Sequence, residues 1–166
     1  SRGLGDVYKR QIMYHPTIPN LVFAGTSEGL FRSDNNFESF SFVQTGNSWE
    51  YNQDYDYIEF HPTDENIIYA STFNNDSHIY VSSDRGQSFV QSGTILGNGS
   101  NIQLSVSAAC ENCVFVGSSD GVWKSDNIAD SFTLVGNPNI ANYGAFAVSD
   151  TDENYMLFGD IDTHMS

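Results

Sequence analysis

Hydrophobic residues recur in short runs, and clusters of Gly, Ser, Asn and Asp separate these runs along the chain. Such spacing is typical of β-strands joined by turns, and no stretch carries the i, i+3, i+4, i+7 pattern that would predict a helix. The pattern therefore predicts an all-β protein. The predicted strands are 11–14, 21–25, 29–33, 39–45, 55–60, 67–72, 78–82, 88–92, 102–107, 113–117, 121–124, 131–135, 145–148 and 155–159.

One segment, an Asn followed by a hydrophobic run, occurs four times. The four copies begin 46, 46 and 42 residues apart, at Asn20, Asn66, Asn112 and Asn154. A His-Pro-Thr turn precedes the first two copies, at 15–17 and 61–63, and a Ser-Asp-Thr turn at 149–151 precedes the fourth. A period of this length indicates that the chain repeats one supersecondary unit.

A second motif follows each of the first three copies. Its complete form, at 82–89, reads S-x-D-x-G-x-S-F. The other two forms are Ser33-Asp34-Asn35 with Ser39-Phe40, and Ser125-Asp126-Asn127 with Ser131-Phe132. With Asp34 and Asp126 aligned to Asp84, these two forms run one residue longer, and they lack the glycine. The sequence ends where the fourth form would begin. Two motifs that alternate at this period predict the blades of a β-propeller.

The S-x-D-x-G-x-S-F segment resembles the Asp-box, or BNR repeat, of sialidase-like propellers. The surrounding H-P-T-x-x-N-hydrophobic pattern is similar to that of sortilin-type and xyloglucanase-like propellers of secreted proteins. Over 12–166 the chain is therefore expected to form an incomplete β-propeller of about three and a half four-stranded antiparallel blades. The expected blades are 12–46, 47–93, 94–136 and a truncated 137–166.

The Asp-box is expected to close a hairpin turn rather than to catalyse a reaction. Asp84 can accept N–H groups of the turn, Ser82 or Ser88 can donate to its carboxylate, and Gly86 can adopt a positive φ. Without that glycine, the turns near Asn36 and Ile128 are expected to be looser. The residues assigned this structural role are Ser82, Asp84, Gly86, Ser88, Phe89, Ser33, Asp34, Phe40, Ser125, Asp126 and Phe132.

Residues 1–11 differ in composition from the rest, and 6–11 resembles the translation of a sequencing adapter. We interpret 1–11 as a non-native artefact and leave it out of the fold prediction. The net charge of the whole chain is −15, from 21 acidic and six basic residues. Because this charge repels phosphate, no nucleic-acid partner is expected, and no apolar run approaches the roughly 20 residues of a membrane span. The family resemblance implies a secreted or cell-surface protein whose signal peptide is not in this sequence.

Two sets of loops are expected on one face of a propeller: those joining the second and third strands of a blade, and those joining successive blades. They carry aromatic residues beside carboxylates, which suits stacking on a sugar ring and hydrogen bonding to its hydroxyl groups. These candidate ligand-face residues are Trp49, Tyr51, Asp54, Asp76, Tyr143, Asp160 and Asp162.

Two functions remain open at this point. The first is a binding or scaffold module for glycan or protein ligands, completed by the remaining blades of the same chain. The alternative is an internal part of a xyloglucanase-like or sialidase-like glycoside hydrolase. No residue is assigned as catalytic, because the sequence does not place two carboxylates across a bond. The arginine cluster of a sialidase site is not apparent, because only Arg32 and Arg85 follow the first eleven residues.

Cys110 and Cys113 are the two cysteines of the chain. A small structural disulfide is the favoured interpretation, and two reduced thiols are the next. A redox-active pair lacks the expected βαβ context. Half a zinc site lacks a second cysteine pair, and the four histidines lie in other repeats than the cysteines. No metal and no cofactor are therefore predicted.

Overall fold

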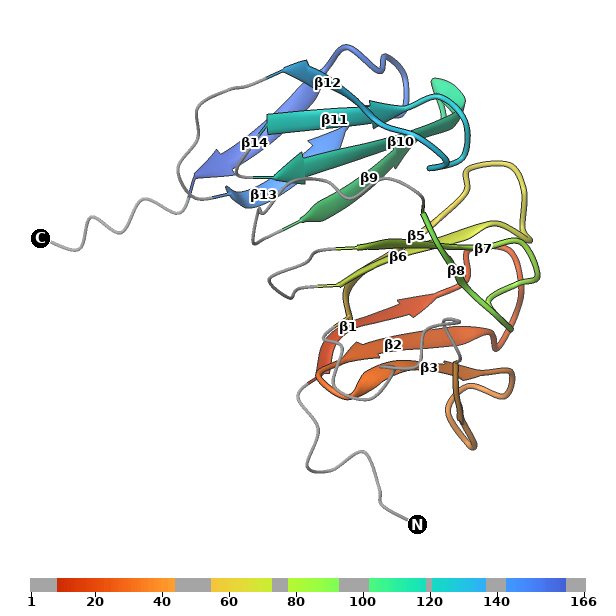
Figure 1. Cartoon of the computed structure of the whole chain (residues 1–166). Helices are drawn as coiled ribbons and strands as arrows, with labels where there is room; N and C mark the ends of the chain where they lie inside the picture. The colour runs from red at the N-terminus through yellow and green to blue at the C-terminus, as the bar shows by residue number, and fades with distance from the viewer. Residues whose placement is uncertain are drawn as a thin grey trace, which may run out of the picture.

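The computed structural model describes residues 9–43, 55–72, 78–92, 102–118, 121–136 and 143–160. Within these ranges the chain forms fourteen strands in four antiparallel sheets. We call these sheets blades 1 to 4, and they follow one another in space in chain order (Figure 1). The predicted all-β fold, a partial propeller of four-stranded antiparallel sheets, is confirmed. No helix in the described part of the chain is long and apolar enough to cross a membrane.

Each blade is a simple meander in which neighbouring strands pair antiparallel. Blade 1 contains β1 (Lys9–Tyr14), β2 (Val22–Thr26), β3 (Gly29–Ser33) and β4 (Ser41–Phe42). Blade 2 contains β5 (Tyr55–Phe60), β6 (Ile68–Thr72), β7 (Ile79–Ser82) and β8 (Val90–Gln91). Blade 3 contains β9 (Gln103–Ser107), β10 (Cys110–Ser118), β11 (Gly121–Ser125) and β12 (Thr133–Gly136). Blade 4 contains β13 (Tyr143–Val148) and β14 (Met156–Asp160).

The meander gives every blade two different ends. The connections from first to second strand and from third to fourth strand share one end, which we call the turn end. The connections from second to third strand and from one blade to the next start and finish at the other end, the loop end. The first strands β1, β5, β9 and β13 contact one another in order, so they form one side of the stack.

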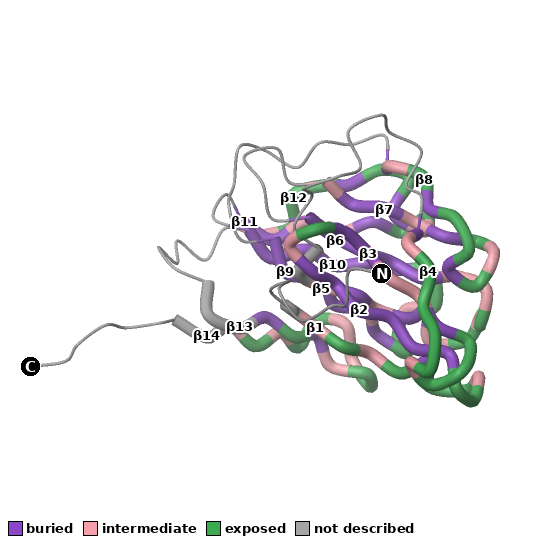
Figure 2. Tube along the Cα trace, turned by 90° about the horizontal axis from the view of Figure 1, so that it is seen from below, coloured by how far each residue is buried: buried purple, intermediate pink, exposed green. Residues whose placement is uncertain are grey.

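The second strands of blades 1 to 3 are largely apolar and are buried along most of their length. All five residues of β2 and of β6 are buried, as are residues 113–118 of β10 (Figure 2). Between blades 1 and 2, Phe23 and Leu30 pack in one cluster with Ile58, Ile68 and Phe89. Similar clusters lie between blades 2 and 3 and between blades 3 and 4. Burial of these side chains, at roughly 1.5–3 kcal/mol each, is what holds successive blades together.

Several strands extend beyond their predicted bounds, among them β1 and β10. β1 begins at Lys9, inside the segment that the sequence analysis set aside, and Lys9 pairs with Thr26 of β2. Backbone groups make this pairing, so it requires no particular side chains. β10 begins three residues before its predicted start, because Cys110 pairs with Ser107 ahead of an irregularity in the ladder.

Candidate functional site

The complete S-x-D-x-G-x-S-F motif, at 82–89, closes the β7–β8 turn through a network of short hydrogen bonds. The Ser82 hydroxyl accepts the backbone N–H of Gly86 at 2.8 Å and donates to Asp84 Oδ1 at 2.7 Å. The Asp84 carboxylate also accepts the Ser88 backbone N–H at 2.9 Å and the Ser88 hydroxyl at 2.6 Å. Burial alone would raise the pKa of Asp84, but the bonds from Ser88 and Ser82 outweigh it and lower that pKa. The carboxylate is thus engaged in closing the turn.

In the first turn the structure gives the role of Asp84 to Asn35, and not to Asp34 as the sequence alignment proposed. Asn35 Oδ1 accepts the Ser33 hydroxyl at 2.9 Å and the Ser39 backbone N–H at 2.9 Å. Its amide nitrogen donates to the Ser39 hydroxyl at 2.9 Å. In the complete motif the corresponding bond runs the other way, because Asp84 has a second acceptor oxygen where asparagine has a donor. Asp34 is exposed and pairs with Arg32 at 2.7 Å.

The third turn repeats this correction. Asn127 Oδ1 accepts the Ser125 hydroxyl at 2.8 Å and the Ser131 backbone N–H at 3.1 Å. Asp126 is exposed and pairs with Lys124 at 2.9 Å. Counted from Ser33, Ser82 and Ser125, the three turns therefore have the same length, and the apparent extra residue came from aligning the wrong acidic side chain.

The turns without glycine are not looser than the complete one. Each of the three turns has two consecutive residues at positive φ, namely Asn36–Phe37, Arg85–Gly86 and Ile128–Ala129. The second residue of each pair donates its N–H to the serine that opens the turn, at 2.9, 2.8 and 3.0 Å respectively. The side-chain network holds this backbone shape even where a Cβ makes it unfavourable.

The turns of blades 2 and 3 each pack against the preceding blade. Phe89 of blade 2 is buried in the cluster that contains Phe23 of blade 1, and Phe132 of blade 3 is buried with Tyr69 of blade 2. Phe40 of blade 1, at the equivalent place, is 41% exposed, because no described sheet precedes blade 1. The turns therefore contribute to contacts between blades.

The two His-Pro-Thr turns use their imidazoles as turn acceptors. His15 Nδ1 accepts the backbone N–H of Ile18 at 3.1 Å, and His61 Nδ1 accepts that of Asp64 at 3.0 Å. A neutral imidazole whose Nδ1 accepts carries its proton on Nε2. His15 Nε2 lies 3.1 Å from the Glu65 carbonyl in blade 2, and burial lowers the pKa of this histidine. Neither ring offers a free Nδ1 lone pair to a metal.

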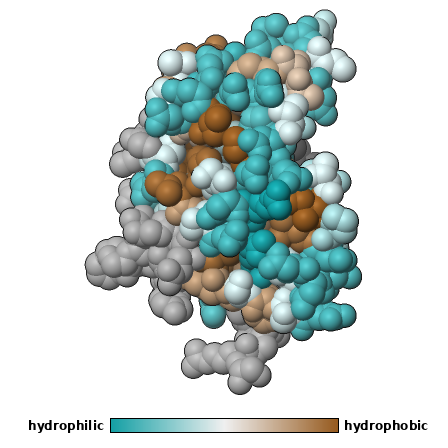
Figure 3. Space-filling view, turned by 90° about the vertical axis from the view of Figure 1, so that its right-hand side faces the viewer, coloured by the Kyte–Doolittle hydropathy of each residue, from teal (hydrophilic) through white to brown (hydrophobic). Residues whose placement is uncertain are grey.

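A hollow of about 650 Å³ lies between these turns at the turn end. Figure 3 looks onto this end of the sheets, where hydrophilic residues surround separate hydrophobic patches. The residues that line the hollow are His15, Pro16, Thr17, Phe60, His61, Pro62, Thr63, Glu65, Val106, Ala108 and Asp150. Near it, burial raises the pKa of Glu59 to about 7, and the charge of Asp150 adds to the shift. Sequence analysis gave no sign of this carboxyl, because its environment comes from another blade.

The candidate ligand face falls almost entirely outside the described residues. Tyr143 and Asp160 are paired across the β13–β14 ladder at the loop end, but their side chains are not described. The candidates in the segments that connect strands or follow β14 lie outside the described residues: Trp49, Tyr51, Asp54, Asp76 and Asp162.

Cys110 and Cys113 are joined by a disulfide in the turn between β9 and β10. In blades 2 and 4 the position of Cys110 is held by Asp64 and Asp152, whose Oδ1 atoms accept the backbone N–H of Asn66 at 2.9 Å and of Asn154 at 3.0 Å. The disulfide of blade 3 therefore replaces a side-chain-to-backbone bond as the closure of this turn.

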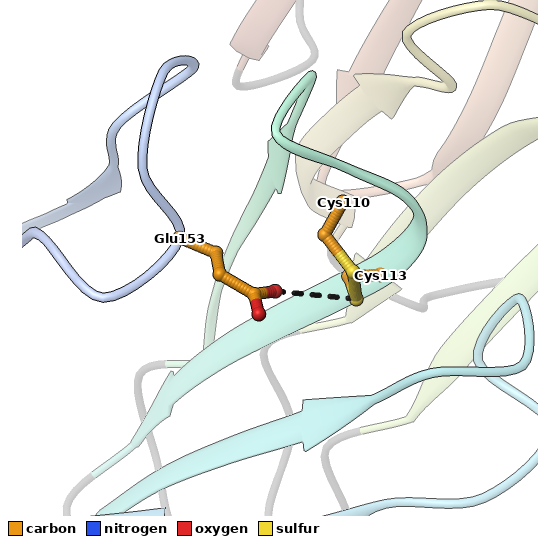
Figure 4. Close-up of side chains that lie close together, drawn as sticks. All are labelled: Cys110, Cys113 and Glu153. Carbon is orange, nitrogen blue, oxygen red and sulfur yellow. Dashed lines mark hydrogen bonds between the residues drawn. A yellow bond between two sulfur atoms is a disulfide. The ribbon is translucent and has the colours of Figure 1, made fainter.

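Two carboxylates that sequence analysis did not connect with the cysteines lie beside this disulfide, and one lysine pairs with both of them. Cys113 Sγ lies 3.2 Å from Asp126 Oδ1. It lies 3.7 Å from Glu153 Oε2, the contact that Figure 4 shows as a dashed line. Lys124 Nζ lies 2.9 Å from Asp126 Oδ1 and 3.0 Å from Glu153 Oε2. The position of Glu153 in the repeat is the sequence signal that could have identified it, because Glu153 is the residue before the Asn that opens the fourth copy.

No family model matches the chain, and a search of curated proteins finds no significant match. Solved structures do resemble it. An ancestral GH74 enzyme has 22% identity and a TM-score of 0.72, covering 86% of this chain and 21% of its own. The GH74 xyloglucanase from Xanthomonas campestris has 21% identity and a TM-score of 0.67, covering 86% and 23%. YCF48 from Cyanidioschyzon merolae has 12% identity and a TM-score of 0.61, covering 86% and 47%.

The chain thus spans less than a quarter of the length of the two GH74 proteins. At these identities the likeness concerns the fold, and the neighbours are β-propellers. The stacked four-stranded meanders and these neighbours lead to the same conclusion: the chain has the fold of a partial β-propeller.

Proposed function

We propose that the chain is a binding module, formed by several blades of a larger secreted or cell-surface propeller that holds a glycan at its loop end. The observation that supports this proposal is the meander topology, which attaches both sets of connecting loops to the same end of every blade. In the sequence these loops carry the aromatic and acidic residues suited to a sugar, including Trp49, Tyr51 and Asp54.

Uncovered apolar surfaces on the two outer blades support the view that further blades of the same chain complete the propeller. Ile12 of blade 1 pairs with Ala24 as the buried Ile58 of blade 2 pairs with Ala70, yet Ile12 is exposed. Leu157 of blade 4, equivalent to the buried Phe115 of blade 3, is 77% exposed. These apolar positions are buried in inner blades and exposed in outer ones, as expected where each blade of a repeat covers the apolar face of its neighbour.

Glycan binding can be tested by affinity electrophoresis and calorimetry of the 166-residue chain with a panel of soluble polysaccharides that includes xyloglucan. We expect one polysaccharide to bind, and Trp49→Ala or Tyr51→Ala to weaken it about tenfold, since a stacked aromatic contributes roughly 0.5–1.5 kcal/mol beyond its burial. Phe40→Ala, which removes an exposed aromatic ring at the turn end, is the control and leaves binding unchanged. Absence of binding throughout the panel contradicts the proposal.

The likeness to GH74 enzymes favours a second candidate, part of a glycoside hydrolase. Hydrolysis requires two carboxyl groups roughly 5–10 Å apart across the cleaved bond. Release of reducing ends from xyloglucan, abolished by Asp54→Asn or Asp160→Asn while binding persists, favours this candidate. Binding without release of reducing ends favours the binding module.

A further inference from the structure

The side chains around the Cys110–Cys113 disulfide converge on one small volume at the boundary between blades 3 and 4. Sγ of Cys110, Sγ of Cys113 and a carboxylate oxygen of Glu153 all lie within 4.8 Å of one another. Asp126 Oδ1 lies 3.2 Å from the Cys113 sulfur but does not belong to this group of three, so the exposed Asp126 side chain would have to move closer to join it. Cys113 is buried, and Cys110 and Glu153 are partly buried. Figure 4 shows the Glu153 carboxylate pointing toward the cysteine pair.

The charges at this boundary show that a cation is favoured there. Two carboxylates, one from each blade, approach the same Lys124 ammonium at 2.9 and 3.0 Å. Both oxygens that face the ammonium also face the sulfur of Cys113, at 3.2 Å for Asp126 and 3.7 Å for Glu153. A divalent ion between them and the sulfurs would therefore meet two negative oxygens at once.

We propose that the reduced cysteine pair binds one zinc ion, with Cys110, Cys113, Asp126 and Glu153 as its four ligands. A C-x-x-C pair is a common half of a tetrahedral zinc site, and carboxylate oxygens complete such sites. In a tetrahedron with Zn–S of about 2.3 Å and Zn–O of about 2.1 Å, sulfur and oxygen lie about 3.6 Å apart. The two sulfur-to-oxygen distances here, 3.2 and 3.7 Å, lie on either side of that value.

The change from disulfide to metal site requires a reductant, for which a water-soluble phosphine serves. The phosphine gives two electrons to the S–S bond, which breaks, and it becomes a phosphine oxide with the oxygen of one water molecule. The two protons of that water complete the two thiols. Zinc then forms two Zn–S bonds as the two thiol protons pass to solvent, because the thiolate is the metal ligand.

This site would connect two blades, whereas the disulfide closes a turn within one. Glu153 belongs to the turn between β13 and β14, and the other three ligands belong to blade 3. Zinc would take both carboxylate partners of Lys124 and would be repelled by its positive charge. Lys124 therefore opposes zinc binding. The inference concerns the turn end and does not depend on glycan binding at the loop end.

The test is a zinc titration of the 166-residue chain, reduced by the phosphine without oxygen, with bound metal counted per chain after dialysis. We expect one zinc per reduced chain and none per oxidised chain, and a cobalt-substituted sample should show thiolate-to-metal absorption. Glu153→Gln and Asp126→Asn should each weaken zinc binding about tenfold or more, because even residues behind the ligands cost 10–100-fold. Lys124→Met should strengthen it.

The matched control is Glu111→Gln, in the same turn, which removes an exposed carboxylate bonded to Thr63 at 2.7 Å and should leave zinc affinity unchanged. Circular dichroism of every reduced variant shows whether the sheets persist. Failure of the folded, reduced chain to bind zinc overturns the proposal. Zinc binding that is indifferent to Glu153, Asp126 and Lys124 also overturns it, because the thiols alone would then account for the metal.

Discussion

Gly86 of blade 2 lies directly against the ring of Phe23 of blade 1, so closely that a Cβ on Gly86 would stand 2.3 Å from a ring carbon. Gly86 has a φ of +73°, which a residue with a side chain adopts at a cost. The contact explains why this turn carries glycine although the equivalent turns do not. In blade 3 the same position is the buried Ala129, which packs in the cluster with Tyr69.

We expect Gly86→Ala to lower the free energy of unfolding by about 2–5 kcal/mol, since the left-handed backbone costs roughly 1–2 kcal/mol and overpacking a further 1–3. Urea denaturation followed by tyrosine fluorescence measures the change. Gly136→Ala is the control, because a Cβ there meets no atom within 4 Å and should change stability by less than about 0.5 kcal/mol. Equal effects of the two substitutions would refute the contact with Phe23.

The reassignment of the first turn gives a direct comparison between neighbouring residues. Asn35→Ala should destabilise the protein by about 1–3 kcal/mol, because it removes the acceptor of Ser33 and of the Ser39 N–H. Asp34→Ala should cost less than about 1 kcal/mol, since its ion pair with Arg32 involves a side chain that is 70% exposed. Thermal unfolding of the two variants measures the difference in stability. A larger loss of stability for Asp34→Ala than for Asn35→Ala would support the original alignment, in which Asp34 has the role of Asp84.

Sequence reasoning located the strands because covered second strands leave an uninterrupted apolar run, as in 113–117. It misaligned the turns because aspartate and asparagine offer the same acceptor oxygen, so the position of the acid, Asp34, was a poorer guide than the distance from Ser33. The sequence did not predict that Glu153 lies near Cys113, because contacts between blades depend on how the sheets stack and not on spacing within one repeat. The candidate residues of the loop end remain a prediction.

Glu59 should make stability depend on pH in an identifiable direction. Its folded-state pKa of about 7, raised by burial and by Asp150, exceeds the ordinary value of 4.5, so the folded protein binds this proton more tightly than the unfolded chain. Its contribution to stability is fully present below about pH 4.5 and is lost as pH rises to about 7. Glu59→Gln should therefore stabilise the protein by up to about 3 kcal/mol at pH 8 and much less at pH 5.

Urea denaturation of the wild type and of Glu59→Gln at pH 5 and pH 8 measures this difference. Glu38→Gln makes the same chemical change at an exposed carboxylate. It therefore corrects for the loss of one negative charge from an acidic protein. If the stability gained by Glu59→Gln, after this correction, is the same at both pH values, Glu59 does not take up a proton on folding.

The repeat also predicts how the disulfide of blade 3 can be replaced. Cys110→Ser with Cys113→Ser should cost about 2 kcal/mol, the value expected for opening a four-residue loop. Cys110→Asp with Cys113→Ile gives blade 3 the residues of blade 2 and should recover much of that loss, because Asp64 Oδ1 there accepts the Asn66 N–H at 2.9 Å and its side-chain amide at 2.8 Å.

Denaturation midpoints of the two double variants, measured without reductant beside the wild type, test this replacement. An Asp at 110 should place its carboxylate on the N–H of Asn112, as Asp152 does on Asn154 in blade 4. The gain should disappear in Cys110→Ala with Cys113→Ile, which keeps the apolar side chain and removes the acceptor. If that variant is as stable as the one with Asp, the apolar residue and not the turn closure compensates for the missing disulfide.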